Sequence, residues 1–108
     1  MAVTHAQPGE VIDVRPLGAG LAAARTVTLV KTPTLEVIRL VVPAGKEHPP
    51  HQVPGEITVQ CLEGRVAFTA GDATRELSAG HMLYLAGGQR HALRGLENSS
   101  LLLTILLR

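Results

Sequence analysis

Hydrophobic residues along the chain come in short bursts separated by Gly, Pro, Asp and Asn. This pattern is typical of β-strands and lacks the spacing of an amphipathic helix. Turn signals lie between the bursts, among them Glu63-Gly64, which is typical of a tight hairpin. We predict strands over residues 11–14, 25–31, 35–42, 56–62, 65–69, 74–77, 82–85, 91–96 and 101–107. Many short strands of this kind indicate an all-β sandwich or barrel.

Only residues 17–25 have a helical composition, and Gly18 and Gly20 limit that helix to a short one. Two of the predicted strands, 35–42 and 101–107, carry hydrophobic residues on both faces, which is unusual in a sheet with one solvated side. Two explanations stay open. Either other strands or the short helix cover the second face, or that face is buried in a homodimer. A chain this small has few spare layers, so we expect a homodimer.

Composition excludes several classes of protein. The chain has 108 residues, 45% hydrophobic and 18% charged, with a net charge of +1, unlike a disordered tail or a strongly basic nucleic-acid binder. Aromatic residues make up 2%, too few for stacking on single-stranded nucleic acid. The single cysteine, Cys61, excludes an intramolecular disulfide and favours a reducing compartment. No signal-peptide pattern or membrane-spanning run is visible, so we expect a cytoplasmic protein with no membrane or nucleic-acid partner.

Candidate chemistry lies in two segments. Residues 43–68 contain His48 and His51, and residues 79–93 contain His91 after a pair of glycines. Imidazole is a ligand that Zn, Fe, Ni and Cu accept, and such ions generally take at least three protein ligands. The two segments together therefore indicate a binding site if the fold brings them close to each other.

The two segments together resemble the paired motifs of the cupin superfamily, a small β-barrel in which the motifs meet inside the barrel and usually hold a divalent metal. The second motif matches in spacing: five residues separate Gly80 from Ala86, and His91 follows the Gly-Gly pair after two more residues. Ala86 stands where the motif has proline, and Gly95 where it has asparagine.

The first motif matches in frame but not in chemistry. Gly45 and His51 have the motif's spacing, and Gly64 closes it at the expected distance. The second histidine position falls on Val53, and the glutamate position falls on Ile57. The resemblance is therefore more specific for the fold than for the function.

The resemblance implies an all-β fold: a cupin or jelly-roll β-barrel, also called a double-stranded β-helix, with at most one short N-terminal helix. We expect a single domain over 1–108. The cupin core covers about residues 35–108, and an N-terminal strand and short-helix segment covers residues 10–34.

By this resemblance His51 and His91 are the candidate metal ligands. Two prolines separate His48 from His51, and a polyproline II segment has a three-residue period, so His48 returns to the same side as a candidate third ligand. Glu56 lies one residue before the motif's glutamate position, so either strand alternation turns it away from the interior or it lies at the irregular start of the strand. Gln60, of the same parity as Glu56, is a weaker fourth candidate.

The inward positions of the predicted strands give a mostly apolar pocket. Tyr84 is either a packed residue or one that points into this pocket, Gln52 and Gln89 lie beside the key histidines, and His81 is a surface turn residue. The predicted lining is Val53, Ile57, Val59, Cys61, Phe68, Tyr84, Gln60 and Gln52.

Three functions stay open. The first is a small cupin whose degenerate site holds a divalent transition metal (Zn, Fe, Ni or Mn) and acts on or binds a small molecule. The second is a metal-free, non-catalytic binding or sensor cupin in which the histidines anchor a ligand in an apolar pocket. The third, a structural dimer or regulatory domain with a vestigial pocket, is the least favoured because the sequence shows no partner domain.

Overall fold

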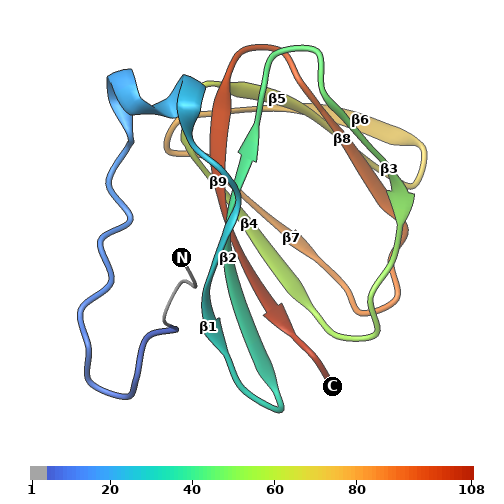
Figure 1. The fold of residues 1–108 in the computed structure, drawn as a ribbon. Coiled ribbons are helices and arrows are strands. Elements are labelled where there is room, and N and C mark those ends of the chain that lie inside the picture. Colours follow the sequence, from blue (N-terminus) through green and yellow to red (C-terminus); the bar gives the residue numbers. More distant parts are fainter. Residues whose placement is uncertain (1–4) are drawn as a thin grey trace.

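The computed structural model describes residues 5–108, and strands dominate it (Figure 1). One short 3-10 helix, η1 (Gly18–Ala23), precedes the strands. No helix in this part of the chain is long and apolar enough to cross a membrane. The strands are β1 (Val27–Lys31), β2 (Leu35–Val42), β3 (Glu47–His51), β4 (Ile57–Glu63), β5 (Arg65–Ala70), β6 (Ala73–Ser78), β7 (Met82–Leu85), β8 (His91–Gly95) and β9 (Ser99–Leu106).

The strands form two antiparallel sheets that face each other. One has five strands in the order β1-β2-β9-β4-β7, and the other has four in the order β3-β8-β5-β6. Strands that are neighbours within a sheet are often distant in the sequence, such as β2 and β9, as a jelly roll requires. The predicted all-β jelly-roll barrel with one short helix is confirmed.

The core lies between the sheets because alternate residues of the facing strands point inward. In β4 the buried residues Ile57, Val59 and Cys61 alternate with half-buried ones, and in β5 Val66 and Phe68 do the same. The buried hydrophobic cluster consists of Val42, Ile57, Val59, Cys61, Val66, Phe68, Leu77, Leu85, Leu93, Leu101 and Ile105.

The predicted strand over residues 11–14 is wrong. This stretch belongs to an N-terminal segment, drawn in blue in Figure 1, that runs beside the barrel without joining a sheet. It caps an outward residue of β2 instead: the Nη2 atom of Arg39 donates to the Asp13 carbonyl at 3.1 Å, and Arg39 is only 6% exposed. The second face of β2 is thus partly covered within the chain itself.

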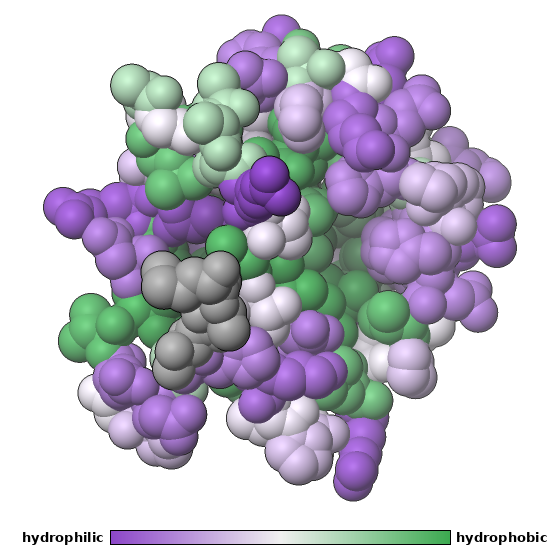
Figure 2. Space-filling model, viewed as in Figure 1, coloured by the Kyte–Doolittle hydropathy of each residue, from purple (hydrophilic) through white to green (hydrophobic). Residues whose placement is uncertain are grey.

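Other outward hydrophobic residues of the five-stranded sheet stay exposed, namely Met82, Tyr84 and Leu106. Figure 2 shows hydrophobic surface in the middle of its view, framed by hydrophilic side chains. The homodimer expected from the sequence stays a prediction.

The strand β3 was not predicted. Its sequence reads Glu-His-Pro-Pro-His, and proline normally disrupts a sheet because it has no N–H to donate. Here β3 lies at the edge of the four-stranded sheet and pairs only with β8, so the prolines are tolerated. The pairing register shifts between His48 and His51, which has consequences for the site.

Candidate functional site

Two loops at one end of the barrel bring the key histidines together. The loop between β3 and β4 packs on the turn between β7 and β8, where the Gly88 N–H donates to the Val53 carbonyl at 2.8 Å. A Cβ atom on Gly87 would lie 2.4 Å from the Pro54 carbonyl oxygen, so only glycine allows this approach. His51 ends β3 and His91 begins β8, and the two are register partners.

The imidazoles of His51 and His91 lie side by side. Their ring centroids are 4.3 Å apart, with the planes tilted by 59°. His51 is exposed, whereas His91 is 7% exposed. The His91 ring also stacks on Phe68, at 5.7 Å and nearly parallel, which fixes its plane against the core.

Backbone carbonyls fix the tautomers of both rings. Nδ1 of His51 lies 3.3 Å from the Pro49 carbonyl, and Nδ1 of His91 lies 3.0 Å from the Gln89 carbonyl. A carbonyl oxygen can only accept, so each Nδ1 carries the proton and each Nε2 of a neutral ring keeps a lone pair. Neither Nε2 has a hydrogen-bond partner among residues 5–108. Two neighbouring lone pairs are thus free to bind a cation or a hydrogen-bond donor.

Burial keeps two of the histidines neutral. It lowers the pKa of His91 below its usual value, and the nearby His51 lowers it further, against the effect of the hydrogen bond to Gln89. The pKa of His48 is lowered by burial first, and then by Lys46 and His51. Near neutral pH these imidazoles are therefore acceptors or ligands rather than cations.

The histidines lie at one end of a cavity of about 160 Å³ inside the barrel. His48 lines it too, because the register shift in β3 returns its side chain to the face of His51. The rest of the lining is hydrophobic: Ile38, Leu40, Val53, Ile57, Val59, Phe68, Leu93, Leu103 and Ile105. A cavity of about 150 Å³ of this character holds a molecule the size of benzene.

Four residues predicted to line the pocket lie elsewhere. Cys61 is fully buried at the other end of the barrel, where its Sγ contacts the Glu63 and Gly64 carbonyls. Gln60 and Tyr84 lie on the outer face, because alternation along β4 and β7 puts Ile57, Val59, Leu83 and Leu85 inside. Gln52 is exposed in the loop after β3.

Glu56 points away from the cavity, as the parity argument predicts. It is exposed, and one carboxylate oxygen accepts a hydrogen bond from the Tyr84 hydroxyl. His81 is an exposed turn residue whose Nδ1 accepts from the Ser78 N–H. Neither residue is placed to contact a ligand in the cavity.

Five cavity residues were missed by the sequence reasoning, namely Ile38, Leu40, Leu93, Leu103 and Ile105. The sequence pattern that could have identified them is the alternation along β2, β8 and β9, which puts every second residue on one face of the sheet. The hydrophobic residues on both faces of β2 and β9 masked which set points inward.

The donor set does not complete a metal centre. No group of three His, Cys, Asp or Glu side chains within residues 5–108 is arranged to hold a metal ion. His51 and His91 supply two donors with free Nε2 atoms, and His48 lines the same cavity without joining them in such a group. Val53 and Ile57, at the positions where the cupin motif has its other ligands, are hydrophobic and line the cavity.

Comparison with known proteins gives one family match. The family model of the cupin domain, Cupin_2, matches residues 38–106, which is more than half of the chain. No curated protein matches the sequence significantly.

Several solved structures share the fold. A cupin superfamily protein from Desulfitobacterium hafniense has a TM-score of 0.78 at 16% identity, over 95% of this chain and 100% of that one. A conserved protein of unknown function from Streptococcus pyogenes has a TM-score of 0.76 at 22% identity, over 100% and 96%. The DMSP lyase DddQ from Ruegeria pomeroyi has a TM-score of 0.68 at 24% identity, over 88% of this chain and 52% of that one. At these identities the likeness concerns the fold alone.

Proposed function

Since this chain belongs to the cupin family, we propose that it binds a small molecule of about the size of benzene in its barrel cavity, with His51 and His91 as the polar anchor. One observation carries the proposal: two imidazoles 4.3 Å apart, each with an Nε2 that has no partner among residues 5–108, lie with His48 at one end of a cavity whose remaining lining is apolar. This combination of an apolar lining with a few convergent polar groups is typical of small-molecule sites.

The chemistry of the anchor defines the ligand. With each Nδ1 directed to a carbonyl, the two imidazoles offer their Nε2 atoms as acceptors, so the ligand presents a hydroxyl or N–H donor to them and a compact apolar body to Ile57, Val59 and Phe68. A phenol or a small cyclic alcohol has this shape.

Several observations favour binding or sensing over turnover. Among residues 5–108, no Asp or Glu lines the cavity to orient a histidine as a general base. The nearby carboxylate of Glu56 faces outward and is held by Tyr84. We therefore propose a non-catalytic binding role for the cavity.

Phenol, with benzene as the matched probe that lacks a donor, tests this role. We expect phenol to shift the NMR signals of residues 48–59 and 91–93 saturably, and benzene to bind more weakly. The variant His51→Ala/His91→Ala should bind both probes equally. Equal binding of phenol and benzene by the unchanged protein, or no saturable binding of either, would contradict the proposal.

A divalent transition metal at the same histidines is the second candidate. The free Nε2 atoms of His51 and His91 favour it, and His48 in the same cavity is the residue that would complete a three-histidine set. A bound metal would supply a Lewis acid for an oxygen-bearing ligand. Metal content after loading with Zn²⁺, Ni²⁺, Fe²⁺ or Mn²⁺ and dialysis tests it. About one equivalent, lost in His51→Ala/His91→Ala, supports the metal, and well below one equivalent contradicts it.

A further inference from the structure

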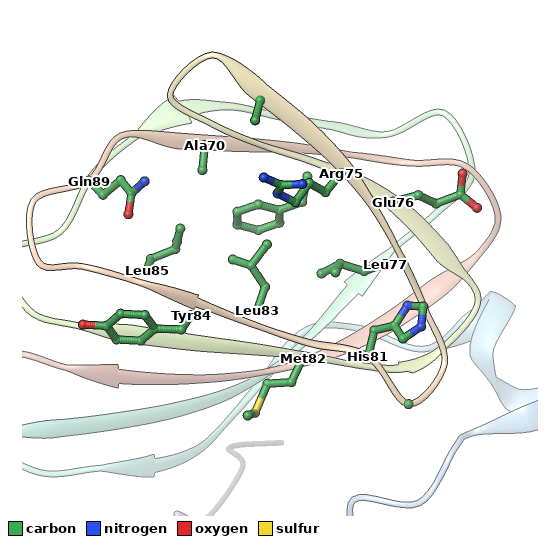
Figure 3. A pocket seen from close by; sticks show the side chains of 13 residues that line it. Ala70, Arg75, Glu76, Leu77, His81, Met82, Leu83, Tyr84, Leu85 and Gln89 are labelled. Atoms are coloured by element: carbon green, nitrogen blue, oxygen red, sulfur yellow. The ribbon is translucent and has the colours of Figure 1, made fainter.

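A second cavity opens on the side of the barrel, away from the histidines. It lies between β6 and β7, has a volume of about 630 Å³, and is called here the lateral cleft. Figure 3 shows Leu77, Leu83 and Leu85 around its floor and Arg75 in front of it. The volume falls in the range of about 300–1,000 Å³ that is typical of small-molecule sites.

The topology explains why the barrel is open here. β6 is the last strand of the four-stranded sheet and β7 the last of the five-stranded sheet, and the two edges are not paired with each other. The register partners Ala70 and Ala73, both lining the cleft, are too small to fill the gap. The hydrophobic floor of the cleft is therefore reachable from outside.

Arg75 is the one charged group of the cleft that has no partner within residues 5–108. Its register partner is Phe68, which points inward, so Arg75 leaves β6 on the same face and lies over the cleft. Within the described part of the chain, no hydrogen bond or ion pair involves its guanidinium. The acidic residue beside it, Glu76, is bound to Arg65 at 2.7 Å. Arg65 also binds Glu97, so the Glu76 carboxylate is directed to Arg65 and Arg75 is the cation left to face the cleft.

A hydrogen-bond donor lies at another part of the rim. The Gln89 Oε1 atom accepts from the Ala86 N–H at 3.1 Å, which leaves the Nε2 donors of the same amide available to the cleft. In Figure 3 the Gln89 side chain reaches toward the cleft from the turn before β8.

We infer that the lateral cleft binds a small amphipathic carboxylate, with its carboxylate paired to Arg75 and its hydrocarbon chain on Leu77, Leu83 and Leu85. A guanidinium matches a carboxylate with two parallel N–H···O bonds, and the hydrophobic floor accounts for the chain. An anion without a chain would leave the floor in water, and a neutral chain would leave Arg75 unpaired.

This site is separate from the barrel cavity. Phe68 lines both spaces and forms the wall between them, with His91 stacked on its cavity side. Binding in the lateral cleft therefore does not depend on a ligand at the histidines. The octanoate experiment below and the phenol experiment above can each give a negative result without affecting the other.

A purely structural role of Arg75 makes a different prediction. Inward-pointing charges on edge strands discourage pairing with another chain, and the arginine stem can cover apolar surface. If Arg75 only did this, its replacement would leave ligand binding unchanged and promote association of the protein.

Octanoate is the probe. 1-Octanol, which has a chain of the same length but no charge, and acetate, which has the carboxylate but no long chain, are the two control compounds. In NMR titrations of the full chain, we expect octanoate to shift the amide signals of β6 and β7 saturably and to bind more tightly than either control compound. Arg75→Gln should weaken octanoate binding about tenfold or more, because a charge-assisted hydrogen bond is lost. Arg94→Gln, an exposed arginine of β8 that does not line the cleft, should bind normally.

A second variant keeps the charge and removes the space. Ala73→Leu fills the cleft beside Ala70 while Arg75 stays, and it should also weaken octanoate binding. Dispersed amide spectra of each variant establish that it is folded. Equal affinity of Arg75→Gln and the unchanged protein, equal binding of octanoate and 1-octanol, or octanoate shifts centred on His51 and His91 would overturn the inference.

Discussion

The two ends of strand β4 differ in how their polar groups are used. Near its C-terminal end, Ser99 and Ser100 are fully buried, and the hydroxyl groups of both have hydrogen-bond acceptors. Near its N-terminal end, the histidine rings keep nitrogen atoms with no partner in the same part of the protein. Polar residues at one end of the barrel thus serve the fold, and those at the other end have capacity left for a ligand.

At the C-terminal end of β4, called here the satisfied end because its polar groups have hydrogen-bond partners, the hydrogen bonds converge on Glu63. Its carboxylate accepts from the Leu17 and Gly18 N–H groups at 2.8 and 3.1 Å and from the Ser100 hydroxyl at 2.6 Å. These hydrogen bonds lower the pKa of Glu63 against the opposing effect of burial, which is the largest single contribution. They also tie the start of η1 to the barrel. A polar cluster is therefore not by itself a sign of a binding site. Such a site also needs polar atoms whose hydrogen-bonding capacity is not used within the protein.

The largest effect should come from restoring the missing ligands at the histidine end. Val53→His with Ile57→Glu would put four donors around one point, together with His51 and His91. We expect the affinity for Zn²⁺ or Ni²⁺ to rise at least about a hundredfold, since complete four-ligand zinc sites contribute about 10–16 kcal/mol. Isothermal titration calorimetry measures this.

Gln60→His with Thr58→Glu is the matched control, because these residues have the outward parity on β4. It should leave metal affinity unchanged. An equal gain in metal affinity in both variants would mean that the position of the donors inside the cavity does not matter for metal binding.

Removal of the carboxylate at the satisfied end should cost about 2 kcal/mol of unfolding free energy. Glu63→Ala takes away the acceptor for three donors and leaves the buried Ser100 hydroxyl unpaired. Glu56→Ala, at the opposite end of β4, removes an exposed carboxylate with one partner and should cost about 0.5 kcal/mol or less. Chemical denaturation compares them, and equal losses would contradict the contrast between the two ends.

Acid should weaken the histidine end. The pKa values of His48 and His91 are lowered in the folded protein, so the unfolded chain binds more protons as the pH falls. Their contribution to stability is complete above about pH 6.5, the usual histidine value, and is lost as the pH falls through their lower folded values. Denaturation at pH 7.5, 6.5 and 5.5 should show this decline. In His48→Asn/His91→Asn it should be smaller, and an unchanged decline would assign it to other groups.

The smallest effect on stability should follow His51→Ala. This side chain is exposed, so its loss should change the unfolding free energy by about 0.5 kcal/mol or less. Phenol binding in the cavity should nevertheless be weakened. A large loss of stability with unchanged binding would make His51 a structural residue.

The sequence was sufficient for the fold and for the position of the histidine pair. Turn residues divided the strands, and the resemblance to the paired cupin motifs implied that His51 and His91 meet at the same end of a barrel. Parity also placed Ile57 and Val59 inside and Glu56 outside. The parity inferences depend on local periodicity, which strands impose on every residue.

The features that the sequence did not predict correctly depend on contacts between segments that are distant in the chain. Edge position alone lets Pro49 and Pro50 form part of β3, and edge position is a property of the whole sheet. Residues 11–14 have the β-branched composition of a strand, yet the Asp13 carbonyl is bound to Arg39 rather than to a neighbouring strand. The lateral cleft was not foreseen, because it exists only where β6 and β7 face each other unpaired.

The buried thiol of Cys61 allows the local stability of the satisfied end to be measured. It has no exposed surface, and burial raises its pKa, so a thiol reagent reacts with it only when the surrounding strands separate. The rate of alkylation under native conditions therefore counts local opening events next to Glu63. It does so without any engineered label, since no other cysteine is present in the sequence to compete for the reagent.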